Sequence, residues 1–261
     1  MLDHLNQLQF DLLEGKFDSV LRISQILIGY LPSSSPHLPE VLLKRGTALM
    51  EMEKYDEAYD VLSQAAKLAP DDGFLLYIYS QSCKYTHRLA KASVAIEEAV
   101  TLEPALLKNR NTKKELNSIR KTIQNVIKLS GKDFTFEQLI EQEELEITGL
   151  RLVKEHKLEE AEALFRQVIA MGDIMIAPHN NLAHCLLRRG KFKEAEQELL
   201  IVLKMDRRNP VARNNLPVVR EAIKTGKIPE FSGVYNPHIG QITDIQPTHS
   251  NLPTGSDLVP D

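Results

Sequence analysis

Residues 46–70 read GTALMEMEKYDEAYDVLSQAAKLAP, and much of this stretch returns in similar form further along the chain. Ala58, near its centre, is matched by Ala92, a step of 34 residues. Other positions keep residues of similar type at the same step: Leu42 and Leu76, Gly46 and Ser80, Leu62 and Ile96, Ala65 and Ala99, Pro70 and Pro104. A fixed period of this length predicts stacked supersecondary units, because no single unit can bury its apolar face alone.

A second pair of segments shows the same step in the C-terminal half of the chain. The matched positions are Gly149 and Ala183, Ala161 and Ala195, Val168 and Val202, and Leu182 and Leu216. The repeat is therefore a property of most of the chain.

The segment 39–72 predicts one hairpin of two helices. In its first half, apolar residues at helical spacing surround the small residue Gly46, which allows a neighbouring helix to approach closely. A polar turn at 53–57 carries one aromatic residue, and the apolar residues of 58–68 then recur at steps of three and four. Pro70 ends the second helix, since proline cannot continue it.

These units resemble the tetratricopeptide repeat. Its pattern has a small residue in the first helix, an aromatic residue at the turn, an alanine opening the second helix, a large residue and a second alanine within it, and a closing proline. The matching residues are Gly46, Tyr55, Ala58, Leu62, Ala65 and Pro70; Ser80, Leu89, Ala92, Ile96, Ala99 and Pro104; Gly149, Leu158, Ala161, Phe165 and Val168; and Ala183, Phe192, Ala195, Leu199 and Val202. The resemblance implies an all-α fold, a right-handed α-α superhelix (solenoid) of tetratricopeptide-like helical hairpins. It also implies a concave face that is lined by the first helix of each unit and holds partner peptides in extended form.

We expect four regions along the chain. Residues 1–104 form an N-terminal array of about three repeats, the first of them degenerate, and 105–141 form a charged helical spacer. Residues 142–226 form a C-terminal pair of repeats plus a capping helix, which closes the last apolar face. Residues 227–261, rich in proline and glycine and without periodicity, form a disordered tail.

The spacer lacks the turn and the alanines of a repeat. An apolar stripe instead predicts one long helix over roughly 106–129, ended at Gly131. A new helix then begins at Thr135, with Gln138 completing a capping box. The alternative is a degenerate repeat hidden in 105–141.

The composition is that of an ordinary folded protein in a reducing compartment. The net charge of −4 gives no general attraction for nucleic acid or an anionic membrane. The two cysteines, Cys83 and Cys185, fall in different repeats and indicate neither a disulfide framework nor a zinc site. The start of the chain lacks a secretory signal pattern, and no apolar run is long enough to span a membrane. These features predict a cytoplasmic protein.

No pattern of catalytic residues emerges. His179 and His184 are five residues apart, whereas helical metal-binding histidine pairs are four apart. The Gly-Lys pairs lack the upstream glycine of a phosphate-binding loop and are typical of turns after helices. We therefore expect no enzyme activity, no cofactor and no metal site.

Two asparagine pairs, 180–181 and 214–215, stand one repeat apart on the expected concave face. An amide both donates and accepts, so it can pair with the backbone of an extended peptide whatever the peptide's side chains. His184 and Arg188 would follow Asn181 by one and two turns of the same helix. The candidate peptide-binding residues here are Asn180, Asn181, His184, Arg188, Asn214 and Asn215. The alternative is that the asparagines cap or solvate helix starts.

In the N-terminal repeats, the candidates for peptide binding are Tyr77 and Lys84, because aromatic side chains flanked by cations can hold an apolar or helical peptide. The alternative is that they pack within the array. The lysine and asparagine clamp by which some tetratricopeptide modules bind chaperone tails is incomplete: Asn181 matches, but Glu146 and Leu150 occupy places that need lysine and asparagine. We do not expect chaperone binding.

Charge is unevenly distributed along the spacer and the helix after it. Residues 105–129 carry seven cations and one glutamate, whereas 134–163 carry nine glutamates and three cations. The first interpretation is that the two segments neutralise each other across an antiparallel packing. The second is a basic stripe for nucleic acid, although the segment has no aromatic residue for stacking on bases.

Together these features predict a non-catalytic scaffold that binds a protein or an extended peptide in the concave groove. One alternative is a targeting or regulatory subunit of an enzyme. Another is an RNA-binding helical repeat protein, although nucleic acid is the less favoured partner.

Overall fold

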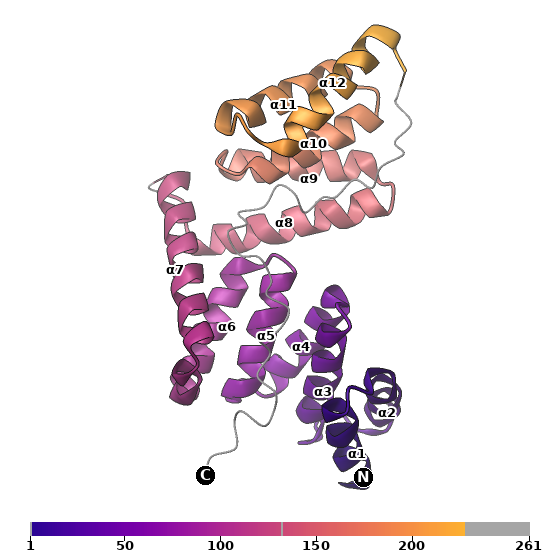
Figure 1. The fold of residues 1–261 in the computed structure, drawn as a ribbon, viewed down its shortest axis with the longest axis vertical. Coiled ribbons are helices and arrows are strands. Elements are labelled where there is room, and N and C mark those ends of the chain that lie inside the picture. The colour runs from indigo at the N-terminus through magenta and orange to yellow at the C-terminus, as the bar shows by residue number, and fades with distance from the viewer. Residues whose placement is uncertain (1, 132, 228–261) are drawn as a thin grey trace. The chain divides into compact units, whose positions relative to one another are not determined.

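The structure, a computed structural model, describes residues 2–131 and 133–227. Every regular element in these residues is a helix (Figure 1). The chain divides into two units, one up to Ile123 and one from Gln124 onward, and each is a stack of antiparallel helical hairpins. The all-α class and the hairpin solenoid fold predicted from the repeat are therefore confirmed.

The described residues of the first unit form three hairpins, in which consecutive helices pack on each other. They are α1 (Leu2–Leu13) with α2 (Phe17–Tyr30), α3 (Leu38–Glu51) with α4 (Tyr55–Leu68), and α5 (Gly73–Tyr85) with α6 (Leu89–Leu102). A short 3₁₀ helix, Pro104–Lys108, follows, and then α7 (Arg110–Ser130), which contains the boundary between the units.

Up to Lys227, the second unit contains two hairpins and a single closing helix. The hairpins are α8 (Phe136–Lys154) with α9 (Leu158–Met171), and α10 (Ile176–Arg188) with α11 (Phe192–Met205). The closing helix, α12 (Pro210–Thr225), packs on α11 and continues past Pro217. None of the described helices is both long enough and apolar enough to cross a membrane. Apart from Lys227, the predicted tail 227–261 lies outside the described residues.

The repeat positions form the cores of both units. The alanines that open the second helices are fully buried: Ala58, Ala92, Ala161 and Ala195. Gly46 and Gly149 show why the first helix needs a small residue. An added Cβ on Gly46 would lie 2.4 Å from Leu62 Cγ, and one on Gly149 would lie 2.7 Å from Phe165 Cε1. The large residue of the second helix therefore occupies the space beside the glycine.

Each of the five hairpins in the described part of the chain turns through a residue in the left-handed region, two positions before the second helix starts. Gly15 and Gly190 adopt it with φ of 69° and 77°, as expected for glycine. Glu53, His87 and His156 adopt it with φ between 59° and 64°, although left-handed backbone costs a side-chain-bearing residue about 1–2 kcal/mol. The packing of the two helices therefore sets the turn conformation.

The long helix predicted over 106–129 starts later than expected. Residues 104–108 form the 3₁₀ helix, and Asn109 separates it from α7 because its side-chain oxygen accepts a hydrogen bond from the Asn111 N–H at 2.8 Å. The helix predicted from Thr135 is confirmed, including its capping box: Gln138 N donates to Thr135 Oγ1 at 3.2 Å, and Thr135 N donates to Gln138 Oε1 at 2.8 Å.

Candidate functional site

The two asparagines of α10 lie inside the helix and are both buried. Asn181 Nδ2 is 3.4 Å from Glu146 Oε1 on α8, which is a contact between first helices of neighbouring repeats. The cap of α10 is Met175, which makes no side-chain capping bond. The alternative that Asn180 and Asn181 cap the start of a helix is therefore wrong.

Asn180 is a buried polar side chain. The residue is 3% exposed, and neither the nitrogen nor the oxygen of its amide has a hydrogen-bond partner among the described residues. Leaving such a group unsatisfied costs about 1–3 kcal/mol. An unsatisfied buried amide of this kind is uncommon in folded proteins.

His184 and Arg188 lie further along the same helix and are half-buried. Burial lowers the pKa of His184 to about 4, and the positive charge of Arg188 contributes to the shift. The imidazole is therefore neutral at pH 7, so one ring nitrogen donates and the other accepts.

Glu146 is the residue of this site that sequence reasoning missed. From the sequence, Glu146 is notable only because it occupies a place where the chaperone clamp needs lysine. Burial raises the pKa of its carboxyl to about 7. Its position in the sequence could have indicated the contact. Glu146 lies 35 residues before Asn181, which is close to one repeat length and puts the two side chains on neighbouring first helices.

The second asparagine pair differs from the first. Asn214 is exposed and Asn215 is half-buried on α12. The cap of α12 is Asn209, whose side chain accepts a hydrogen bond from Ala212 N at 3.0 Å. Asn214 and Asn215 therefore do not cap this helix either, and they remain candidate ligand contacts.

The contacts of Tyr77 and Lys84 favour the packing alternative. Tyr77 is 3% exposed, and its phenol oxygen lies 3.5 Å from the hydroxyl of Thr112 on α7. Lys84 Nζ lies 2.5 Å from Glu115 Oε1, also on α7. Both side chains join α5 to a helix one repeat step further along the chain.

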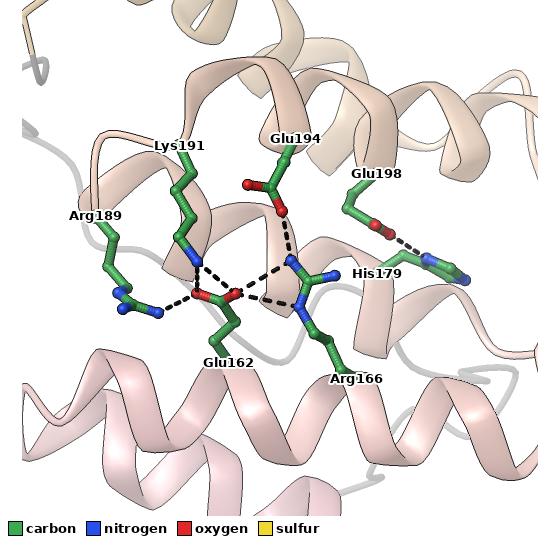
Figure 2. A network of polar contacts seen from close by, with 7 residues as sticks. All are labelled: Glu162, Arg166, His179, Arg189, Lys191, Glu194 and Glu198. Atoms are coloured by element: carbon green, nitrogen blue, oxygen red, sulfur yellow. Dashed lines mark hydrogen bonds and ion pairs between the residues drawn. The ribbon is translucent and has the colours of Figure 1, made fainter.

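A polar network stabilises the second unit (Figure 2). Glu162 of α9 accepts hydrogen bonds from Arg166 of the same helix, from Arg189 and from Lys191, the last at 2.9 Å. Burial would raise the pKa of the Glu162 carboxyl, but its hydrogen bonds with Lys191, Arg166 and Arg189 bring it below its usual range. Arg166 also donates to Glu194 of α11 at 2.6 Å. The network therefore ties α9 to the turn before α11 and to α11 itself.

His179 belongs to the structural part of this unit. Its two ring nitrogens contact Glu198 and Asp173, so it is occupied within the fold. Figure 2 shows the imidazole facing Glu198, away from the Glu162 network. In the part of the chain that the structure describes, no group of three histidine, cysteine or carboxylate side chains is placed to hold a metal ion.

The stacked hairpins define an all-helical repeat protein. Tetratricopeptide-repeat family models match residues 39–72 and residues 152–214. The chain is a tetratricopeptide-repeat protein, as the sequence resemblance predicted. No curated protein matches the sequence at a significant level.

Several solved structures resemble the chain at low sequence identity. The TPR domain of P58(IPK) is 15% identical over 85% of this chain, with a TM-score of 0.45, and this chain spans 65% of that domain's length. The TPR2AB domain of yeast Sti1 in a pHSP90 complex is 14% identical over 86% of each chain, with a TM-score of 0.38. MamA is 15% identical over 74% of this chain and 91% of its own, with a TM-score of 0.34.

Proposed function

We propose that the chain is a non-catalytic protein-interaction scaffold, and that α8, α10 and α12 of the second unit bind an extended segment of a partner protein. Repeat solenoids use the surface of their stacked first helices for binding. Asn181, His184 and Arg188 provide donors and acceptors along one helix, and Glu146 contacts Asn181 from the neighbouring first helix.

The observation that carries the proposal is the set of half-buried polar side chains on two neighbouring first helices, Glu146 on α8 and His184 and Arg188 on α10. A peptide backbone offers one donor and one acceptor per residue, and the neutral imidazole of His184 can pair with either group. An extended peptide can supply both at once, because its backbone groups are not paired internally.

The test begins with affinity purification and mass spectrometry to identify the partner, followed by binding measurements with the purified partner. We expect Asn181→Ala together with Arg188→Ala to weaken binding by about tenfold or more, as for the loss of two hydrogen-bonding groups. Circular dichroism should show unchanged helical content.

Gln167→Ala together with Arg207→Ala is the matched control. It removes one amide and one guanidinium from exposed positions on α9 and in the loop before α12. The control should bind as the parent does. If the Asn181 and Arg188 double variant also retains the partner, the assignment to the first-helix surface is wrong.

A further inference from the structure

Helix α7 carries a face of single charge sign. Six exposed cations lie on this helix or at the end of the 3₁₀ helix before it: Lys108, Arg110, Lys113, Lys114, Lys121 and Lys128. None of the six has an ion-pair partner within the described residues. The one acidic residue of the helix, Glu115, is half-buried and paired with Lys84.

The cations follow a regular spacing. Four of them and two amides recur at alternating steps of four and three residues, in the order Arg110, Lys114, Asn117, Lys121, Gln124, Lys128. Steps of this size place the six side chains on one face of a helix. From Arg110 to Lys128 this line, hereafter the basic ridge, is about 27 Å long at the helical rise per residue.

The basic ridge lies opposite the buried side of α7. The apolar residues Leu116, Ile119, Ile123 and Val126 are buried, and they project roughly half a turn away from the ridge. The N-terminal part of α7 also occupies the place of another first helix, because Glu115 contacts Gln81 at a step of 34 residues and Thr112 contacts Tyr77 at a step of 35. Within the first unit, the described helices include no second helix that follows it as a hairpin partner.

A polar outer face is ordinary for the end of a repeat array, but a solubilising face mixes both charge signs. Like charges at a spacing of four residues, such as Arg110 and Lys114, destabilise an isolated helix. A ridge that has only cations and neutral amides is better explained by binding of an anionic partner than by solubility alone, because the partner's negative charges would offset the repulsion between the cations.

We propose that the basic ridge of α7 binds an acidic α-helix of a partner protein. Alternating steps of three and four residues form the seam along which two helices pack side by side. Carboxylates at the same spacing on the partner would meet the lysines and the arginine as ion pairs, and Asn117 and Gln124 would donate amide hydrogens to them.

The features of α7 favour a narrow acidic helix over a nucleic acid. Helix α7 contains no aromatic residue that could stack on a base. The Glu97 carboxylate of α6 borders the ridge, since it pairs with Arg120 at 2.8 Å, and a broad phosphate surface would meet its charge. This surface is separate from the peptide site proposed on α8, α10 and α12, so either proposal can fail alone.

Two labelled alanine-based helical peptides test the proposal with the full chain. One carries glutamates at alternating steps of four and three on one face, and the other has the same composition with its glutamates spread around the helix. In fluorescence anisotropy at about 50 mM salt, where charges are weakly screened, we expect the one-faced peptide to bind about tenfold more tightly. Its affinity should fall steeply as salt is added.

The ridge variant is Lys114→Gln with Lys121→Gln, and the matched control is Lys67→Gln with Lys193→Gln, exposed lysines of α4 and α11. Both change the net charge equally. We expect the ridge variant to lose about fivefold or more in affinity and the control to lose less than about twofold.

Three results would overturn the proposal. Equal affinity for the two peptides would show that the ridge does not recognise the spacing of the glutamates. Absence of binding would show that the ridge is already neutralised within the protein. Tighter binding of a 20-base-pair duplex than of the one-faced peptide, lost in the ridge variant, would assign the ridge to nucleic acid instead.

Discussion

The Nδ1 atom of His179 lies 2.6 Å from a carboxylate oxygen of Glu198, and this contact joins α10 to α11. The other ring nitrogen lies 2.6 Å from Asp173, in the loop before α10. Burial opposes the charged imidazole, but its hydrogen bonds to the two carboxylates raise the pKa of His179 above its usual value. A protonated imidazole that donates to both carboxylates therefore fits this position.

This contact predicts a pH-dependent contribution to stability. A raised pKa means that the charged imidazole stabilises the fold fully below the unfolded value of about 6.5, and that this stabilisation is lost as the pH rises through the folded value. The free energy of unfolding of the parent, relative to His179→Gln, should be about 1 kcal/mol larger at pH 6 than at pH 9. Urea unfolding at the two pH values measures it, and a difference that does not change with pH would contradict the prediction.

The Glu146 carboxyl should also make stability depend on pH, through ionisation that destabilises the fold instead of stabilising it. Its folded pKa of about 7 exceeds the ordinary 4.5, so ionisation destabilises the fold. The penalty is absent below the ordinary value, grows between the two values and is complete above pH 7. We expect Glu146→Gln to raise the free energy of unfolding by about 1–3 kcal/mol at pH 8 and to change it little at pH 4.5.

Glu141→Gln is the matched control for this variant, because it makes the same change at an exposed position of the same helix. We expect it to alter the free energy of unfolding by less than about 0.5 kcal/mol. An unaltered stability of Glu146→Gln at pH 8 would mean that the carboxyl is not penalised by its surroundings.

The close approach of α8 and α9 at Gly149 can be tested by a double-mutant cycle. Alanine at this position places its Cβ against the ring of Phe165, which is fully buried. We expect Gly149→Ala to destabilise the fold by about 1–3 kcal/mol through overpacking, despite the better helix propensity of alanine. In a Phe165→Leu background the same change should be neutral or stabilising. Equal costs in both backgrounds would exclude the steric explanation.

The turn between α8 and α9 should be improved by a single change. His156 is exposed and has a φ of 60°, so glycine at this position removes the cost of left-handed backbone. We expect His156→Gly to raise the free energy of unfolding by about 1 kcal/mol. Gln167→Gly, at an exposed position within α9, should lower it by about the same amount. A destabilised His156→Gly would show that the imidazole stabilises the turn.

The fold could be predicted because its determinants recur at a fixed step. Small residues such as Gly46, buried alanines such as Ala58 and the breaks after second helices all follow from helix packing, which leaves a periodic trace in the sequence. The start of α7 was placed four residues too early, because an apolar stripe does not distinguish a 3₁₀ helix from the first turn of an α-helix.

The contacts of the second unit's polar residues were harder to predict than its fold, because they join residues that are far apart in the sequence and share no sequence motif. Glu146 and Asn181 meet only because neighbouring first helices stack. The partners of Glu162 come from its own helix and from 27 to 29 residues further along the chain, so their pairing depends on the tertiary arrangement. Burial also had to be known before the lowered pKa of His184 could be recognised.

The left-handed residues at the hairpin turns affect how repeats of this kind are recognised. Since a glutamate and two histidines adopt the same conformation as Gly15 and Gly190, a search that requires glycine there overlooks three of the five hairpins that the described residues form. The conformation of the turn is set by the packing of the two helices and does not require glycine. Substitution at this position can therefore remove the glycine from the repeat pattern while the backbone keeps the same conformation.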